Sequence, residues 1–237
     1  MPRFKFYFYD RVDSTNAKAR ELAESGKFNS VAAALSQTKG RGRFNRKWDS
    51  GLGGLYMTIV LEEKPEIVKY LTFIAALSVR KAIKNLGIDP RLKWPNDVLV
   101  DGRKICGILT ETYSGKENFA LIGIGLNVNQ KAFSASKRNR PTSIFIETGR
   151  KYDIKELSRS IARNFNKYHG KMDYGKIVEE WKSYSDTLGK KVNVKTLGKA
   201  YSGKAADIDN DCNLIIKMEN GKTMKIVEGD VFTIRPS

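Results

Sequence analysis

The strongest constraint on the fold lies between residues 91 and 127. Strand-like segments follow one another there with short turns between them, at residues 91–93, 98–100, 104–113 and 118–127. Pro95 ends the first segment, because proline fixes φ and lacks the N–H that a sheet ladder requires. Asp101-Gly102 is a hairpin turn sequence, so the segments on either side of it should pair. The chain must therefore be built around a sheet.

The rest of the N-terminal part supplies further strands and helices. Strands are predicted at residues 4–9, 31–36 and 55–61 from their β-forming and apolar residues. Helices are predicted around residues 17–23, 66–86, 153–168 and 177–184, from capping residues and from apolar residues at three- and four-residue steps. Residues 131–143 form a basic, polar loop. The fold class is therefore α+β, a mixed β-sheet backed by helices.

The character of the chain changes near Gly189. Short strands follow, with turn signals at Asn210-Asp211 and Asn220-Gly221. This pattern is typical of a small, β-barrel-like domain of about fifty residues. We therefore expect two domains, a catalytic one at residues 1–186 and a small β domain at residues 187–237.

Composition excludes several classes of protein. With 41% hydrophobic and 29% charged residues, the chain of 237 residues is globular rather than disordered. No apolar run reaches the roughly 18 residues of a membrane span, and the N-terminus lacks the pattern of a signal peptide, so we expect a cytoplasmic protein. Cys106 and Cys212 match no metal spacing, and a single histidine, His169, makes a histidine-based metal site or triad untenable.

The net charge of +17 attracts anionic partners without naming one. The excess is spread along the chain, mostly as single lysines among acidic residues, which is typical of a solvated surface. A basic nucleic-acid-binding protein without catalysis stays open as an alternative, although the sequence offers no recognition helix.

The segment Gly40–Trp48 combines two glycines with four cationic side chains, Arg41, Arg43, Arg46 and Lys47. Arginine binds carboxylate and phosphate oxygens bidentately, and glycine permits close approach of a ligand to the backbone. Taken alone, the loop fits a small-anion site, a basic surface loop or a nucleic-acid contact equally well. We expect its arginines to be unpaired and to repel one another until an anion binds.

A second polar cluster follows the proline at residue 95. Asn96 and Asp97 are presented at the end of a strand, which is a usual place for site residues. The hairpin should bring Arg103 or Lys104 back beside Asp97, so that a carboxylate and a cation converge. The alternative is a surface hairpin with a cross-strand ion pair, worth under about 1 kcal/mol.

The motifs of the whole chain, read in order, are Asp13-Ser14-Thr15-Asn16, Gln37 before Gly40-Arg41-Gly42-Arg43, Arg46-Lys47-Trp48, Lys93-Trp94-Pro95-Asn96-Asp97, Arg103-Lys104 with Gly107, and Gly123-Ile124-Gly125-Leu126-Asn127. Together they strongly resemble the biotin protein ligases, from about residue 5 to the end and including Thr233-Ile234-Arg235. The resemblance implies the class II aminoacyl-tRNA synthetase-like catalytic fold of biotin and lipoate ligases, followed by an SH3-like β-barrel. Ser14 lies too near the start for a preceding helix-turn-helix, so we expect the short form without a DNA-binding domain.

The resemblance also implies the reaction. Members of the family join biotin to ATP, giving biotinyl-5′-AMP, and then transfer the biotinyl group to one lysine of a biotin carboxyl carrier protein of acetyl-CoA or propionyl-CoA carboxylase. ATP and Mg²⁺ would be co-substrates and biotin the substrate, with no bound prosthetic group, no membrane contact and a homodimeric assembly. In the first step a carboxylate must approach the α-phosphate, so preorganised cations are needed to stabilise the charge.

Three groups of residues carry the implied roles. Catalysis is assigned to Arg43, Lys104 and Asp97. Biotin binding is assigned to Ser14, Thr15, Asn16, Gln37, Arg41, Gly42, Arg43, Lys104 and Gly107. Binding of ATP and the adenylate is assigned to Arg41, Arg43, Trp48, Lys93, Asn96, Asp97, Lys104, Asn127 and Arg235. Asp97 would bind Mg²⁺ or receive the proton of the attacking lysine, and both roles stay open.

A lipoate–protein ligase is the nearest alternative, because it shares the general fold and the adenylate chemistry. The Gly-Arg-Gly-Arg loop and the Lys-Trp-Pro-Asn-Asp motif favour biotin over lipoate. Cys106 is expected to be structural, since an acyl-adenylate needs no covalent enzyme intermediate.

Overall fold

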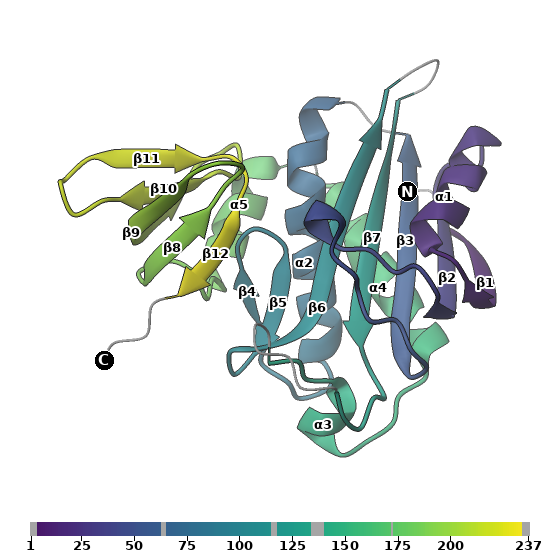
Figure 1. Ribbon diagram of the computed structural model, residues 1–237. Helices are drawn as coiled ribbons and strands as arrows, with labels where there is room; N and C mark the ends of the chain where they lie inside the picture. Colours follow the sequence, from purple (N-terminus) through teal and green to yellow (C-terminus); the bar gives the residue numbers. More distant parts are fainter. Residues whose placement is uncertain (1–3, 63–64, 115–117, 134–139, 172, 234–237) are drawn as a thin grey trace.

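The computed structural model describes residues 4–62, 65–114, 118–133, 140–171 and 173–233. Its centre is a seven-stranded sheet with the order β1-β2-β3-β7-β6-β5-β4 (Figure 1). The strands are β1 (Lys5–Val12), β2 (Ser30–Gln37), β3 (Gly54–Glu62), β4 (Arg91–Lys93), β5 (Asp97–Val100), β6 (Arg103–Tyr113) and β7 (Phe119–Asn127). β1 and β2 pair in parallel and the other neighbours pair antiparallel, so the predicted mixed sheet is confirmed.

The period-two alternation of the strands divides the side chains between two helical layers. On β3, Met57 and Ile59 face the main core, whereas Val60 packs against α1 on the opposite face. The helices are α1 (Thr15–Glu24), α2 (Val68–Lys84), α3 (Ile144–Thr148), α4 (Ile154–His169) and α5 (Tyr174–Ser183), with short 3₁₀ turns η1 (Arg43–Asn45) and η2 (Pro65–Ile67). α2 and α4 lie together on the main-core face (Figure 1).

The face of the sheet that carries α1 has three glycines, Gly107 on β6 and Gly123 and Gly125 on β7. A Cβ atom on Gly123 or Gly125 would collide with a neighbouring side chain, and one on Gly107 would lie 3.0 Å from Trp48. Asn16 lies against Gly123, and Trp48 lies against the other two glycines. Glycine is therefore required here by close approach, and it leaves room for a cavity above the sheet.

The C-terminal part forms a second, five-stranded antiparallel sheet with the order β11-β10-β9-β8-β12. Its strands are β8 (Lys191–Lys195), β9 (Ala200–Ile208), β10 (Leu214–Lys217), β11 (Thr223–Ile226) and β12 (Asp230–Thr233). Alternate residues such as Val192 and Val194 are fully buried, which gives this sheet an apolar inner face. The small β domain expected from the sequence is confirmed, and the boundary after residue 186 stays a proposal.

Trp94 joins the two sheets. Its side chain is 2% exposed, and its indole N–H donates to the carbonyl of Cys212 at 2.9 Å. Its backbone N–H donates to Thr187 Oγ1 at 3.0 Å. The residues on either side of Trp94 and Pro95 are predicted site residues, so the small domain holds the strand end that presents them.

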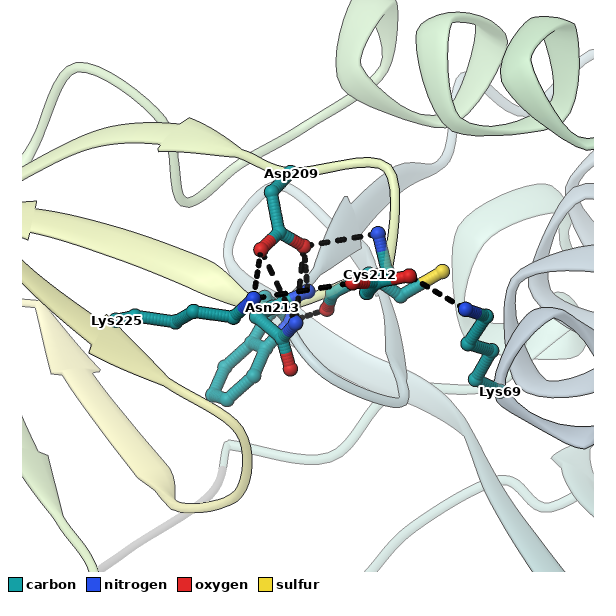
Figure 2. A network of polar contacts seen from close by, with 7 residues as sticks. Lys69, Asp209, Cys212, Asn213 and Lys225 are labelled. Carbon is teal, nitrogen blue, oxygen red and sulfur yellow. Dashed lines mark hydrogen bonds and ion pairs between the residues drawn. The ribbon is translucent and has the colours of Figure 1, made fainter. Parts of the chain in front are cut away.

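The turn that receives the indole is itself tied down by charge (Figure 2). Asp209 accepts hydrogen bonds from the backbone and side chain of Asn213 and an ion pair from Lys225 at 2.8 Å. Lys69, from α2, pairs with Asp211 at 2.5 Å. Contacts from α2 and from β11 of the small domain thus hold the turn that carries the Cys212 carbonyl.

Most local predictions agree with the structure. Asp101 and Gly102 both have positive φ, 47° and 71°, as a hairpin turn of this kind requires. Ser14 and Asp153 are the N-caps of α1 and α4. α3 was not predicted, because a five-residue helix is too short to show a periodic pattern. No helix in the described ranges has both the length and the apolar composition needed to cross a membrane.

Candidate active site

A cavity of about 180 Å³ lies over the glycine-lined face of the sheet, beside the start of α1. Arg43 and Lys104, both assigned to catalysis from the sequence, line this cavity together. The other predicted site residues that line it are Ser14, Thr15, Asn16, Gln37, Arg41, Gly42, Trp48, Lys93, Asn96, Asp97 and Gly107. Segments far apart in the sequence therefore form one site.

One end of the cavity is polar and uncharged. Ser14 caps α1 by accepting the backbone N–H of Asn16 at 3.2 Å. Thr15 donates both its backbone N–H and its hydroxyl to Gln37 Oε1, at 2.7 and 3.1 Å. The Gln37 amide donates in turn to Ser50 Oγ at 2.9 Å. These bonds fix the orientation of the glutamine, so that end of the cavity is preorganised for a neutral, hydrogen-bonding ligand.

Two further residues belong to this end and were missed by the sequence analysis. Thr58 is fully buried on β3, and its hydroxyl lies 2.7 Å from Asn16 Oδ1 and 2.9 Å from Thr15 Oγ1. Glu111 on β6 accepts a hydrogen bond from Asn16 Nδ2. A signal for Thr58 existed, because a hydroxyl stands within the otherwise apolar run of its strand. Glu111 had no comparable signal in a strand that alternates polar and apolar residues.

The other end of the cavity carries the cation and carboxylate pair expected from the hairpin. Lys104 Nζ lies 2.6 Å from Asp97 Oδ1 and 5.0 Å from the centre of the Trp48 ring. A register shift between Val98 and Leu99 accompanies the pairing of β5 with β6. Of the two candidates, Lys104 is therefore the residue beside Asp97, and Arg103 pairs with Glu147 at 3.0 Å instead.

Trp48 covers the glycines between the two ends. Its ring lies over Gly107 and Gly125, and its indole Nε1 is buried without a hydrogen-bond partner in the described part of the chain. A buried N–H without a partner costs free energy until an acceptor reaches it. Trp48 is thus equipped both to stack on a flat ring and to donate one hydrogen bond.

The arginines of the Gly40–Trp48 loop are paired, which corrects the expectation that they repel one another. Arg43 donates to the Gly229 carbonyl at 3.1 Å and to Glu228 at 3.2 Å. Arg46 pairs with Asp230 through both guanidinium nitrogens. These pairs could not be expected from the sequence, because their carboxylates lie at and just before β12 of the small domain, nearly two hundred residues away.

The same arginines enclose an aromatic ring. The guanidinium carbons of Arg43 and Arg46 lie 4.8 and 5.3 Å from the centre of the Phe44 ring. Phe44 has φ = 55°, an uncommon conformation for a residue with a Cβ atom. The loop therefore adopts a definite fold across the cavity mouth, with its third cation, Arg41, 3.5 Å from Glu111.

Lys93 and Asn96 flank the proline turn and face the same cavity. Burial is the main cause that lowers the pKa of Lys93, partly offset by nearby carboxylates such as Asp97. Asn96 donates to the carbonyl of Ile108 at 2.6 Å, and its oxygen accepts from Arg43 at 3.4 Å. The Asn96 side chain is therefore held in place by its own hydrogen bonds.

Two predicted nucleotide-binding residues gain no support from the described part of the chain. Asn127 is buried, does not line the cavity, and donates to the carbonyl of Thr142 at 2.9 Å. Arg235 lies outside the described residues. The nucleotide roles of both stay proposals.

Cys106 and the carboxylates limit the chemistry of the site. Burial raises the pKa of the Cys106 thiol far above its ordinary value, so the thiol is not a nucleophile at neutral pH. Among the described residues, no group of three or more histidine, cysteine, aspartate or glutamate side chains could hold a metal ion. A metal that arrives with a triphosphate would reach Asp97, which already pairs with Lys104.

Comparisons with known proteins identify the same chemistry. Residues 8–129 match the biotin/lipoate A/B protein ligase family, and residues 187–233 match the biotin protein ligase C terminal domain. The chain is 34% identical over 236 residues to the bifunctional ligase/repressor BirA of Bacillus subtilis, covering 94% of this chain and 72% of that protein. It is 30% identical over 252 residues to the biotin–[acetyl-CoA-carboxylase] ligase of Mycobacterium tuberculosis, covering 95% of this chain and 87% of that protein.

Solved structures agree with these relatives. The biotin protein ligase from Aquifex aeolicus in complex with biotin and ATP superposes with a TM-score of 0.85 at 29% identity, covering 98% of this chain and 99% of that chain. The sequence motifs, the cavity and the two-sheet architecture thus agree with both matched segments. The chain belongs to the biotin/lipoate A/B protein ligase family, and its C-terminal segment places it among the biotin protein ligases.

Proposed function

We propose that the protein attaches biotin to a specific lysine of a biotin-dependent carboxylase subunit, in two steps driven by ATP. In the first step a carboxylate oxygen of biotin attacks the α-phosphorus of ATP, which forms biotinyl-5′-AMP and releases pyrophosphate. In the second step the lysine amine attacks the acyl carbon, AMP leaves, and one proton is lost from the amine. The carrier is a biotin carboxyl carrier protein or domain.

The cavity suits the first step because its two ends differ in charge. The neutral end at Thr15, Asn16 and Gln37 offers hydrogen bonds without charge, as the bicyclic ring of biotin requires. The end at Lys104 and Lys93 offers cations to the biotin carboxylate and the triphosphate. Cations fixed in advance stabilise the charge that builds up as the two anions approach, and this lowers the barrier.

The loop and Asp97 supply the remaining functions. Arg41 and Arg43 close the mouth of the cavity, where they can bind phosphate oxygens bidentately and shield the adenylate from water. Mg²⁺, bound to ATP as part of the co-substrate, neutralises part of the triphosphate charge. Asp97 is the carboxylate nearest to the reacting end, and it accepts the proton of the attacking lysine or contacts Mg²⁺.

A single observation carries this proposal: Lys104 lies between Asp97 and Trp48, in the cavity whose opposite end is the neutral Thr15–Gln37 pair. A lysine in that position can bind a ligand carboxylate on one side and contact the aromatic base of a nucleotide on the other. No comparable observation favours lipoate or a nucleic acid as ligand.

The test is incubation with MgATP, a candidate carrier and either biotin or lipoate. We expect a mass increase on one carrier lysine and AMP formation with biotin, and neither with lipoate. Transfer of lipoate instead, or binding of DNA with steep salt dependence and no AMP formation, would contradict the proposal.

Three finer expectations accompany this function. We propose a homodimer and a cytoplasmic location, and whether the protein binds DNA is measured separately. Sedimentation across a concentration series, cell fractionation and DNA-binding measurements address these points one by one, and each can fail without affecting the ligase assignment.

A further inference from the structure

Glu111 occupies an unexpected position for a carboxylate. It lies on β6, with its side chain 24% exposed, and it contacts both Asn16 and Arg41. Glu111 does not itself line the cavity, but both of these partners do. The ligands of the proposed reaction are themselves anions, so a negative charge beside the cavity weakens their binding unless it serves another purpose. Glu111 lies four residues along β6 from Gly107, roughly 13 Å away, so it stands beside the neutral end of the cavity.

The surroundings of Asn16 restrict its amide to one orientation. Asn16 Oδ1 accepts from the hydroxyl of Thr58 at 2.7 Å, and Nδ2 donates to Glu111. A carboxylate only accepts hydrogen bonds, so the flipped amide would place two oxygens against each other. Gly123 lies against the amide, where a Cβ atom would collide with Asn16 Oδ1, so glycine at this position leaves room for the amide.

The fixed orientation leaves one donor of Asn16 for a ligand. An amide nitrogen carries two hydrogens, and in the described part of the chain Nδ2 donates only to Glu111. Asn16 lines the cavity, so its second N–H is available there, whereas a flipped amide would offer a carbonyl oxygen. The orientation of this one amide therefore decides whether an acceptor or a donor of the ligand is recognised.

We propose that Glu111 is a positioning residue that fixes the Asn16 amide, so that a single N–H faces a hydrogen-bond acceptor of the biotin ring system, and that it also tethers Arg41 at the cavity mouth. The proposal rests on the function proposed above. Arg41 Nη2 lies 3.5 Å from Glu111 Oε1, so one carboxylate connects the floor of the cavity to the loop that covers it.

The test measures the steady-state rate of adenylate formation in several variants, with the release of pyrophosphate as the signal. Glu111→Ala should raise the KM for biotin roughly tenfold or more, because Asn16 loses the partner that orients it. The KM for ATP should change much less, because the contact of Glu111 with Arg41 is long, at 3.5 Å, and solvent screens it. Glu111→Gln should have a smaller effect, since its carbonyl oxygen still accepts from Asn16. Glu24→Ala, an exposed glutamate on α1 paired with Arg20, is the matched control.

A double variant separates positioning from simple stabilisation. Asn16→Asp alone places two carboxylates together and should lower both Tm and biotin affinity. Combined with Glu111→Gln, it rebuilds the hydrogen bond with donor and acceptor exchanged, so Tm should recover. The residue at position 16 then offers only acceptors to the cavity, so the KM for biotin should stay high. Recovery of the KM together with Tm would overturn the proposal.

The remaining outcomes are also decisive. An unchanged KM for biotin in Glu111→Ala would overturn the proposal, and if that variant does not fold, the double variant decides. Calorimetric titration of the wild-type protein with biotin distinguishes the two levels of inference. Absence of biotin binding there would defeat the proposed function itself, whereas normal binding with unaffected variants would defeat only the role of Glu111.

Discussion

The hydrogen bond between Trp94 and Cys212 is the contact through which the small domain most directly supports the active site. Trp94→Phe keeps an aromatic ring in place but removes the indole N–H that reaches the Cys212 carbonyl at 2.9 Å. The carbonyl lies in a turn held by contacts from α2 and β11, so it cannot easily move to find water (Figure 2).

The expected loss follows from two contributions. A buried carbonyl left without its donor costs about 1–3 kcal/mol. The smaller phenylalanine ring leaves unfilled space at a site that is 2% exposed, which costs about 1–2 kcal/mol more. We expect a total of about 2–5 kcal/mol, equivalent to a decrease in Tm of roughly 4–20 °C for a protein of this size.

Trp181→Phe is a closely matched control. Trp181 is fully buried against Phe73, and its indole N–H has no hydrogen-bond partner within the described ranges. The same substitution there removes ring volume but no hydrogen bond, so it should cost about 1–2 kcal/mol. The difference between the two variants isolates the contribution of the hydrogen bond.

The assay is urea unfolding followed by circular dichroism, together with the KM for ATP. Trp94→Phe should raise the KM for ATP, because Lys93 and Asp97 flank the anchored turn, whereas Trp181→Phe should leave it unchanged. Equal losses of stability in the two variants would refute the role given to the hydrogen bond. An unchanged KM for ATP in a destabilised Trp94→Phe would refute the link to the site.

Three further substitutions probe the charges of the cavity. Lys104→Ala should slow pyrophosphate release by roughly 100-fold or more while Tm changes little, because a cation at the reacting carboxylate is lost; a rate near that of the wild type would contradict this. Arg43→Glu should let biotinyl-5′-AMP escape into solution, detected by chromatography of a protein-free filtrate, and retention of the adenylate would show that Arg43 does not close the cavity. Lys93→Met should raise Tm at pH 7, because burial lowers the lysine pKa and the unfolded state therefore binds the proton more strongly. As pH rises from the lowered pKa of Lys93 toward 10.5, the folded wild-type protein loses its buried charge and becomes more stable. The Tm advantage of Lys93→Met over the wild type should therefore shrink over this pH range. A Tm difference that stays constant would refute the assignment.

The elements of the fold could be predicted from local patterns. Asp101-Gly102 predicted the hairpin because few residues adopt its positive φ angles, and Pro95 predicted the end of β4 because it cannot donate to a ladder. The convergence of Arg43 and Lys104 could be predicted because the motifs around them resemble those of one family. The sequence left open whether Arg103 or Lys104 lies beside Asp97, because the register shift that accompanies this pairing is not encoded in a local pattern. It also missed α3, whose five residues are too few to show a periodic pattern.

Other parts of the site depend on tertiary contacts alone. Thr58 and Glu111 are single residues in strands, and their importance arises only because Asn16 comes to lie between them. The same is true of Glu228 and Asp230, which meet the loop arginines only because β12 packs beside the cavity. Sequence reasoning treats the two domains separately, so it cannot assign partners across them.

The pairing of the loop arginines gives a physical reason why the loop can hold and then exchange ligands. A carboxylate contacts each of the three loop arginines, Arg41, Arg43 and Arg46. In each of these ion pairs, at least one of the two side chains has 18% or more of its surface exposed to solvent. Ion pairs of this kind contribute about 0–1 kcal/mol each, because solvent screens them. A triphosphate or adenylate bound beneath the loop offers the same guanidinium groups a denser negative charge at bidentate distance. The carboxylates of Glu228 and Asp230 therefore keep the arginines oriented toward the cavity at little energetic cost, and a phosphate can replace them without the loop having to fold from a disordered state.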